Sequence, residues 1–230
     1  HNTPLLSEVI HNPLPSRFLL RQNDLSSPPP GCSDLAPGSY LIHLGTVWYK
    51  NRLGVLAIWE QTLKLGLNYD LVMIGEPNSD LNAWISAHPL LSPRIHFLKN
   101  VPDDYLVYLY HYAAALLFPS FYEGFGWPII EALACGCPVF TTNRPPMTEV
   151  GGDFANYLPI APNIFNVSEW NSWARQCARI LFEALSTPNH LPGPNSAGHR
   201  SQWIESFSQQ SWLDKLLRQY HHAYSLQVSS

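Results

Sequence analysis

Short apolar runs alternate with longer stretches of helical periodicity from about residue 40 onward. Near-continuous apolar runs of strand length, separated by helices, are typical of βαβ units and of a parallel sheet covered by helices on both faces. The sequence therefore predicts an α/β fold with a Rossmann-like, doubly wound parallel sheet. The predicted strands are residues 40–44, 69–74, 94–98, 113–118, 138–141 and 156–160, the last with the weakest pattern.

The predicted helices lie between and after these strands, where apolar side chains recur at helical spacing. Asp103 is predicted to cap the third helix, and Pro128 suits the first turn of the fourth. Ser168 is predicted to cap a long helix that continues to Leu185. The full set is 53–65, 81–85, 103–112, 128–134, 168–185 and an amphipathic helix from about 208 to 226.

Frequent prolines, including the run 28–30, forbid a long helix in the first 39 residues. A second stretch rich in proline, glycine and asparagine follows at 187–198. We therefore divide the chain into an irregular N-terminal segment at 1–39, a Rossmann-like domain at 40–204 and a closing C-terminal helix at 205–230.

The composition narrows the class of protein. Hydrophobic residues make up 46% of the chain, charged residues 13%, and the net charge is −4, which supports a folded core and excludes the basic footprint of a nucleic-acid-binding protein. Cys135 and Cys137 are too closely spaced for a usual zinc or redox pair, so we expect buried thiols. The apolar stretch 105–118 is too short for a transmembrane segment and no signal peptide is recognisable, so we expect a cytoplasmic protein.

In a doubly wound sheet, ligands bind beyond the carboxyl ends of the strands. The loops 45–52, 75–80, 99–104, 119–128 and 142–149 are therefore the places to look for a site. The loop at 119–128 carries the strongest signal, because Gly124 and Gly126 leave backbone amides uncovered just before a helix, which favours a phosphorylated ligand. A dinucleotide fingerprint would need a third glycine where Ile129 stands, and a P-loop would need a Gly-Lys-Ser/Thr sequence.

Two carboxylates, Glu123 and Glu131, lie on either side of this turn and can face one cleft. Carboxylates accept strong hydrogen bonds from sugar hydroxyls but repel phosphate, so roles directed at sugar or ribose fit them best. Taken singly, each could equally be an ordinary acid at or near a helix. The combination of strand, glycines, proline and both acids favours a site.

The segment 118–136 resembles the E-x7-E signature of the group-one retaining glycosyltransferases with GT-B architecture, the family of glycogen and sucrose synthases. Five further segments are similar to motifs of that family, in the family's order. They are 9–18, 40–51, 95–104, 149–153 and the Phe-Ser…Trp sequence at 207–212.

The resemblance implies a nucleotide diphosphate-sugar site in the C-terminal half of such an enzyme. Glu123 would bind the donor sugar and Lys50 would neutralise the leaving diphosphate, and these two would carry the catalysis; Glu131 would bind the ribose. Lys50 on its own could equally be a solvated lysine before a helix. The implied donor-sugar and phosphate contacts are Gly45, Thr46, Lys50, Arg52, Glu123, Gly124, Phe125, Gly126 and Trp127, with Thr141 and Thr142 as weaker candidates, and the nucleoside contacts are Asn100, Val101 and Glu131.

The sequence departs from the family pattern in two loops. The run 48–52 is one residue shorter than usual and lacks the arginine that normally precedes the Lys-Asn pair. Either Lys50 takes the place of that arginine with Arg52 as the second cation, or one positive contact is absent. Asn100 stands where the family usually has glycine, and Asn12 is followed by proline where glycine is usual.

The resemblance also implies the reaction and its partners. A hexosyl group, with UDP-glucose as the favoured donor, would pass with retention to a glycan or lipid-linked acceptor, without a metal ion or other cofactor. The acceptor would be held by an N-terminal domain expected to be absent from this chain, so the isolated domain would transfer sugar weakly. The full protein would serve polysaccharide biosynthesis and could lie at the inner membrane. The alternatives are a non-catalytic nucleotide-binding module and an epimerase-like GT-B domain.

Overall fold

The computed structural model describes residues 10–19, 35–162, 166–187 and 197–228. The chain divides into two compact units, one within Arg17–Asn195 and the other formed by the described parts of the two chain ends. The larger unit holds all the strands and every loop in which the sequence analysis placed a site.

A single six-stranded sheet with the order β3-β2-β1-β4-β5-β6 forms the centre of the larger unit, and all neighbouring strands are parallel. The order reverses direction between β1 and β4, which is the position where ligands bind in doubly wound sheets. All six predicted strands are confirmed, and their observed bounds are β1 Tyr40–Leu44, β2 Asp70–Ile74, β3 Ile95–Leu98, β4 Ala115–Phe118, β5 Val139–Thr142 and β6 Asn156–Leu158.

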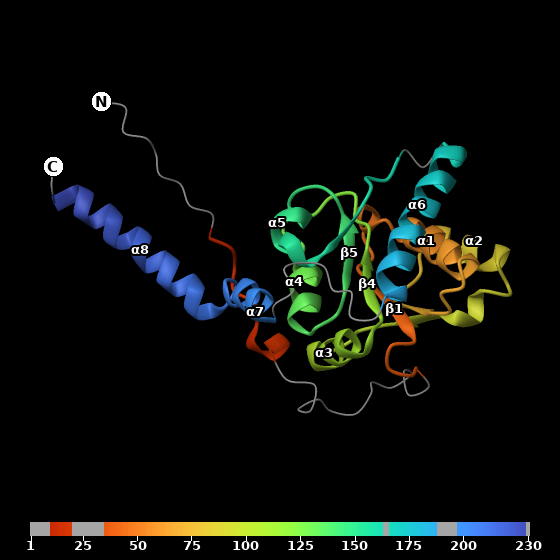
Figure 1. The fold of residues 1–230 in the computed structure, drawn as a ribbon, viewed down its shortest axis with the longest axis horizontal. Helices are drawn as coiled ribbons and strands as arrows, with labels where there is room; N and C mark the ends of the chain where they lie inside the picture. The colour runs from red at the N-terminus through yellow and green to blue at the C-terminus, as the bar shows by residue number, and fades with distance from the viewer. Residues whose placement is uncertain (1–9, 20–34, 163–165, 188–196, 229–230) are drawn as a thin grey trace. The chain divides into compact units, whose positions relative to one another are not determined.

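Helices cover both faces of this sheet (Figure 1). On one face, Trp59 of α1 (Arg52–Lys64) and Trp173 of α6 (Val167–Ser186) pack with Leu41 and Leu117 in one buried apolar cluster. This burial on both faces explains why the strands are apolar throughout rather than alternating. The other helices of this unit are α2 Ser79–Ala87, α3 Asp103–Tyr112, α4 Trp127–Ala134 and the short α5 Met147–Gly151.

Two predicted helix caps are wrong. The helix α3 begins at Asp103 itself, with Pro102 in the N-cap position, so that Asp103 lies in the first turn, where its charge favours the positive end of the helix. The helix α6 is capped by Asn166, whose Oδ1 accepts a hydrogen bond from the Glu169 amide at 3.2 Å, and Ser168 lies inside the helix. In both cases the helix begins one or two residues before the predicted position.

The smaller unit consists of α7 Ala197–Glu205, α8 Gln209–Val228 and the described residues before Ser16. The rings of His11 and Phe207 stack at 5.4 Å, and the Leu14 amide donates to the Phe207 carbonyl at 2.7 Å. The closing helix is therefore found close to its predicted bounds. The prolines 28–30 and most of the stretch 187–198 lie outside the described residues.

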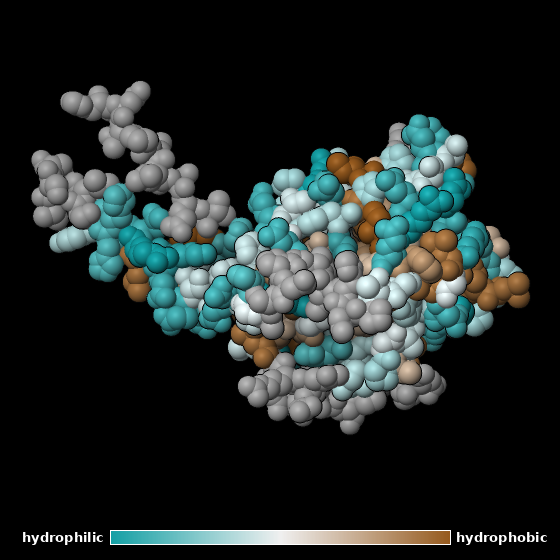
Figure 2. Space-filling model, viewed as in Figure 1, coloured by the Kyte–Doolittle hydropathy of each residue, from teal (hydrophilic) through white to brown (hydrophobic). Residues whose placement is uncertain are grey.

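Hydrophilic residues dominate the face of the larger unit drawn in Figure 2, and apolar residues form separate patches on it. Such scattered apolar residues are usual on protein surfaces. Cys135, Cys137 and Cys177 are buried, as expected for small apolar side chains, and Cys32 lies outside the described residues. None of the described helices combines the length and the apolar character needed to cross a bilayer.

Candidate functional site

The loop after β1 depends on a glycine that leaves room for a lysine. Gly45 has a φ of +105°, which side chains rarely tolerate, and a Cβ atom placed there would lie 2.8 Å from Cγ of Lys50. The aliphatic part of Lys50 therefore runs directly over the Gly45 backbone. This close approach carries the Lys50 ammonium back toward the end of β4.

Asn51 fastens this loop to the neighbouring one. It has a left-handed conformation (φ 55°), and its Oδ1 caps α1 by accepting from the Gly54 amide at 3.1 Å. Its Nδ2 donates to the Pro119 carbonyl at 3.0 Å, and the Phe121 amide donates to the Tyr49 carbonyl at 2.8 Å. The β1 and β4 loops are thus held together by backbone and side-chain hydrogen bonds.

The two residues predicted to be catalytic meet in an ion pair. Lys50 Nζ donates to Glu123 Oε1 at 2.8 Å and to Oε2 at 2.9 Å, and the exposed fractions of the two side chains are 13% and 6%. The ammonium also lies 4.6 Å from the centre of the Phe118 ring, where cation–π attraction adds to the pairing. An ion pair this well shielded from water is stronger than a surface pair.

The turn between Glu123 and α4 presents the positive end of a helix. Gly126 is the N-cap residue of α4 with φ 99°, and no side chain caps this helix end, while Gly124 is exposed. The helix dipole and uncapped amides are suited to bind an anion. Phe125 and Trp127 contact each other edge to face at 4.8 Å beside this turn.

Glu131 lies in α4, half-buried, next to a buried tyrosine. The Tyr110 hydroxyl donates to Glu131 Oε2 at 3.2 Å. Burial raises the pKa of Glu131 to about 7, against the lowering effect of the Tyr110 hydrogen bond, and Asp103 raises it further. Burial likewise raises the pKa of Tyr110, so its hydroxyl stays a donor at physiological pH.

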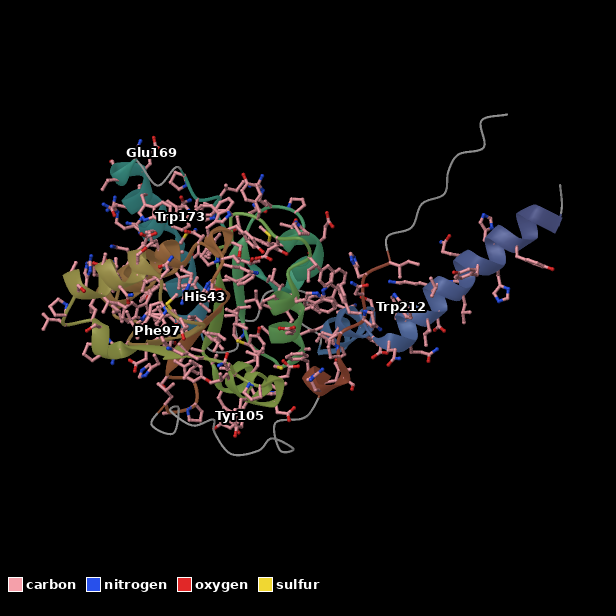
Figure 3. All side chains as sticks on the ribbon, turned by 180° about the vertical axis from the view of Figure 1, so that it is seen from behind. His43, Phe97, Tyr105, Glu169, Trp173 and Trp212 are labelled. Carbon is pink, nitrogen blue, oxygen red and sulfur yellow. The ribbon has the colours of Figure 1, made fainter. Side chains whose placement is uncertain are left out.

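Arg52 and His43 fill the space beneath the β1 loop. The buried Arg52 guanidinium donates to the carbonyls of Gly75 and Glu76 and lies over the Phe97 ring, 5.8 Å from its centre. His43 is fully buried, and burial lowers its pKa to about 3, so the imidazole is neutral. Its Nδ1 lies 2.9 Å from the Leu117 carbonyl. Figure 3 shows His43 and Phe97 within the core of the larger unit.

The remaining predicted contacts lie at the same edge of the sheet. Thr46 packs against Gly75, at which a Cβ atom would collide with the threonine methyl group. Asn100 has a φ of 49°, which asparagine tolerates better than most residues, and this explains why it can replace the usual glycine. Asn100 is exposed and the adjacent Val101 is half-buried, in the loop between β3 and α3.

The two threonines that end β5 have buried hydroxyls with other partners. Thr141 Oγ1 donates to the Phe118 carbonyl at 3.0 Å, and Thr142 Oγ1 donates to the Ser120 carbonyl at 2.7 Å. In this structure both hydroxyls therefore join β5 to the end of β4. Among the described residues, no group of three or more His, Cys, Asp or Glu side chains is arranged to hold a metal ion.

Sequence reasoning missed two residues that shape the site, Asn51 and Tyr110. Asn51 could have been recognised from its position directly before a helix, where asparagine is a preferred cap. Tyr110 carried no local signal, because it reaches Glu131 only through the packing of α3 on α4.

The family model described as "Glycosyl transferases group 1" matches residues 42–181, more than half of the chain. The chain belongs to this family. The group-one resemblance and the GT-B-type fold expected from the motifs are thereby confirmed. The match extends over the whole sheet and thus includes Lys50, Glu123 and Glu131.

Two relatives of this glycosyltransferase-family chain illustrate its similarities. It is 36% identical over 123 residues to "O-antigen chain mannosyltransferase B" of Escherichia coli, which covers 52% of this chain and 32% of that protein. It is 44% identical over 117 residues to "Sucrose synthase" of Solanum tuberosum, covering 47% of this chain and 13% of that protein. The matched segments are therefore a third or less of the relatives' length.

Solved structures agree with the fold. The pneumococcal O-GlcNAc transferase GtfA, solved in complex with UDP and GlcNAc, superimposes with a TM-score of 0.64 at 16% identity, over 81% of this chain and 36% of that one. At this identity the likeness supports the architecture alone.

Proposed function

We propose that this chain is the donor-binding domain of a retaining glycosyltransferase, which takes a hexosyl group from a nucleoside diphosphate sugar and transfers it to a glycan acceptor. The observation that carries the proposal is the Lys50–Glu123 ion pair beside the uncapped N-terminus of α4. Such a site offers positive charge for a diphosphate and a carboxylate for sugar hydroxyls within one turn of chain.

Each group has a role in this proposal. Lys50 and the α4 amides stabilise the negative charge that develops on the departing diphosphate, the kind of electrostatic help that lowers such a barrier most. This positive charge supports a reaction without a metal ion. Glu123 accepts hydrogen bonds from the donor sugar, and Glu131 accepts them from the ribose hydroxyls, for which Tyr110 holds its carboxylate in place.

The names of the relatives favour a mannosyl donor over the glucosyl donor expected from the sequence. Several similar proteins, among them the Escherichia coli relative, are named mannosyltransferases of the O-antigen chain. The sucrose synthase relative keeps UDP-glucose as the second donor to test. The length of these relatives beyond the matched segment supports an acceptor held jointly with a further domain.

Calorimetric titration of the chain with UDP, GDP, UDP-glucose and GDP-mannose tests the proposal. We expect at least one nucleotide to bind in the millimolar range or tighter, and the absence of any binding would refute it. In the Glu123→Ala variant, the extra affinity gained from the sugar should fall more than the affinity for the nucleotide alone. An equal loss for both would contradict the role given to Glu123. Slow hydrolysis of a bound donor would separate an enzyme domain from a binding module.

A further inference from the structure

A second pocket lies beside the Lys50 loop, between the β1 loop and the start of α2. Its volume is about 160 Å³, and Trp48, Phe121, Asn78 and Asp80 are among its lining residues. It is lined neither by Glu123 nor by any residue of the α4 turn. The pocket is therefore distinct from the place where the sugar and phosphates of the donor would bind.

The wall of this pocket is an aromatic side chain in an unusual position. Trp48 is 74% exposed, although burial of an indole is strongly favourable. Its ring lies 6.3 Å from Phe121 and 6.3 Å from Tyr122, which is itself 55% exposed. The Arg144 guanidinium lies over the Tyr122 ring at 4.6 Å and fixes the outer end of this aromatic surface.

The opposite side of the pocket is polar and acidic. Asn78 and Asp80 are both exposed at the start of α2, where Asn78 Oδ1 accepts from the Leu81 amide at 3.0 Å. A carboxylate at this place repels a diphosphate but accepts hydrogen bonds from neutral hydroxyls. An exposed aromatic face opposite a carboxylate and an amide fits the apolar face and the hydroxyl rim of a pyranose ring.

We propose that this pocket binds a hexose unit of the acceptor glycan, with the indole of Trp48 under the sugar ring and Asp80 on its hydroxyls. The assignment rests on the proposed function and specifies where the acceptor lies. Trp48 and Lys50 belong to the same 3₁₀ turn (Trp48–Lys50), so the pocket lies within roughly 10 Å of the Lys50–Glu123 pair. That separation places the bound unit within one or two sugar residues of the transfer site.

The test uses the chain labelled with 5-fluorotryptophan and followed by ¹⁹F NMR, with the Trp48 signal assigned from the Trp48→Phe variant. The probes are α-mannotriose, maltotriose, UDP and GDP. We expect α-mannotriose to shift the Trp48 signal saturably, and Trp48→Ala to weaken its binding about five-fold or more, because the ring contact is lost. Asp80→Asn, which keeps the shape of the side chain, should weaken it about three-fold.

Tyr220→Ala is the matched control, since it removes an aromatic side chain with 69% exposure from α8. It should leave saccharide binding unchanged, and the remaining tryptophan signals report that each variant is folded. Saccharide binding that Trp48→Ala does not weaken, or the absence of saccharide binding, would overturn the assignment. A Trp48 signal that responds to nucleotides but not to saccharides would also overturn it, because the pocket would then belong to the donor. Failure of the proposed function is a different result, in which neither nucleotide nor nucleotide sugar binds.

Discussion

Glu131 lets the physical account of this site be tested without knowledge of the donor. Its carboxyl group is half-buried in α4, accepts the Tyr110 hydroxyl at 3.2 Å and has a pKa raised to about 7, mainly by burial. In the unfolded chain its pKa returns to the model value of 4.5. Replacing it with glutamine keeps the size and removes the titration, so the Glu131→Gln variant isolates the contribution of this one proton.

The sign and size of the effect follow from linkage. Between the two pKa values the folded state binds more protons than the unfolded state, so the contribution of Glu131 is fully present below pH 4.5 and is lost as the pH rises through 7. The shift corresponds to a loss on the order of 3 kcal/mol in the free energy of unfolding. Relative to its difference at pH 4, Glu131→Gln should therefore gain about 3 kcal/mol over the wild type by pH 8.

Urea unfolding of both proteins, followed at several pH values by near-ultraviolet circular dichroism, measures this difference. Glu183→Gln is the matched control, because Glu183 is an exposed helix residue of the same unit. A ¹³C NMR titration of the Glu131 carboxyl gives its pKa directly, and Tyr110→Phe should raise that pKa further by removing the bonding hydroxyl. If wild type and Glu131→Gln keep a constant difference in stability from pH 4 to pH 8, burial of a titrating carboxyl is refuted.

Three further predictions concern the loops around Lys50. Gly45→Ala should lower the free energy of unfolding by about 1–3 kcal/mol and weaken nucleotide binding, because the added methyl displaces Lys50; unchanged urea unfolding and calorimetry would contradict this. Asn51→Ala removes a helix cap and the bond to Pro119 and should cost about 1–3 kcal/mol in urea unfolding, and Asn51→Gly, which keeps the left-handed backbone, should cost less. Nucleotide binding measured by calorimetry should be the same with and without EDTA, and a loss with EDTA would show that Lys50 is not the main counter-charge.

The sheet could be predicted from the sequence because its strands are buried on both faces, which leaves an apolar run that no other element produces at that length. The smaller elements lacked such a pattern. The helix α5 is five residues long, and α7 has no apolar stripe, so neither stands out from a loop. The cap of α6 was misplaced because Asn166 and Ser168 are both good capping residues, and only the geometry decides between them.

The site was predictable to the level of its loops and not of its contacts. Lys50 and Glu123 are far apart in sequence, and their pairing depends on how the β1 and β4 loops are tied together by Asn51. The sequence offered Arg52 as a second phosphate contact, whereas its guanidinium bonds the carbonyls after β2. Long polar side chains reach partners in any direction, so their contacts depend on the tertiary fold.

Under the proposed function, the Lys50–Glu123 pair also decides which ligand the site prefers. Leaving one member of a shielded pair without its partner costs about 3–5 kcal/mol. A nucleotide sugar avoids this cost, because its diphosphate replaces Glu123 as the partner of Lys50 while its hydroxyls replace Lys50 as the partner of Glu123. A nucleoside diphosphate alone supplies only the first replacement and leaves the carboxylate unpaired. The pair therefore favours the donor over the product, and its closure after transfer helps to expel the nucleotide.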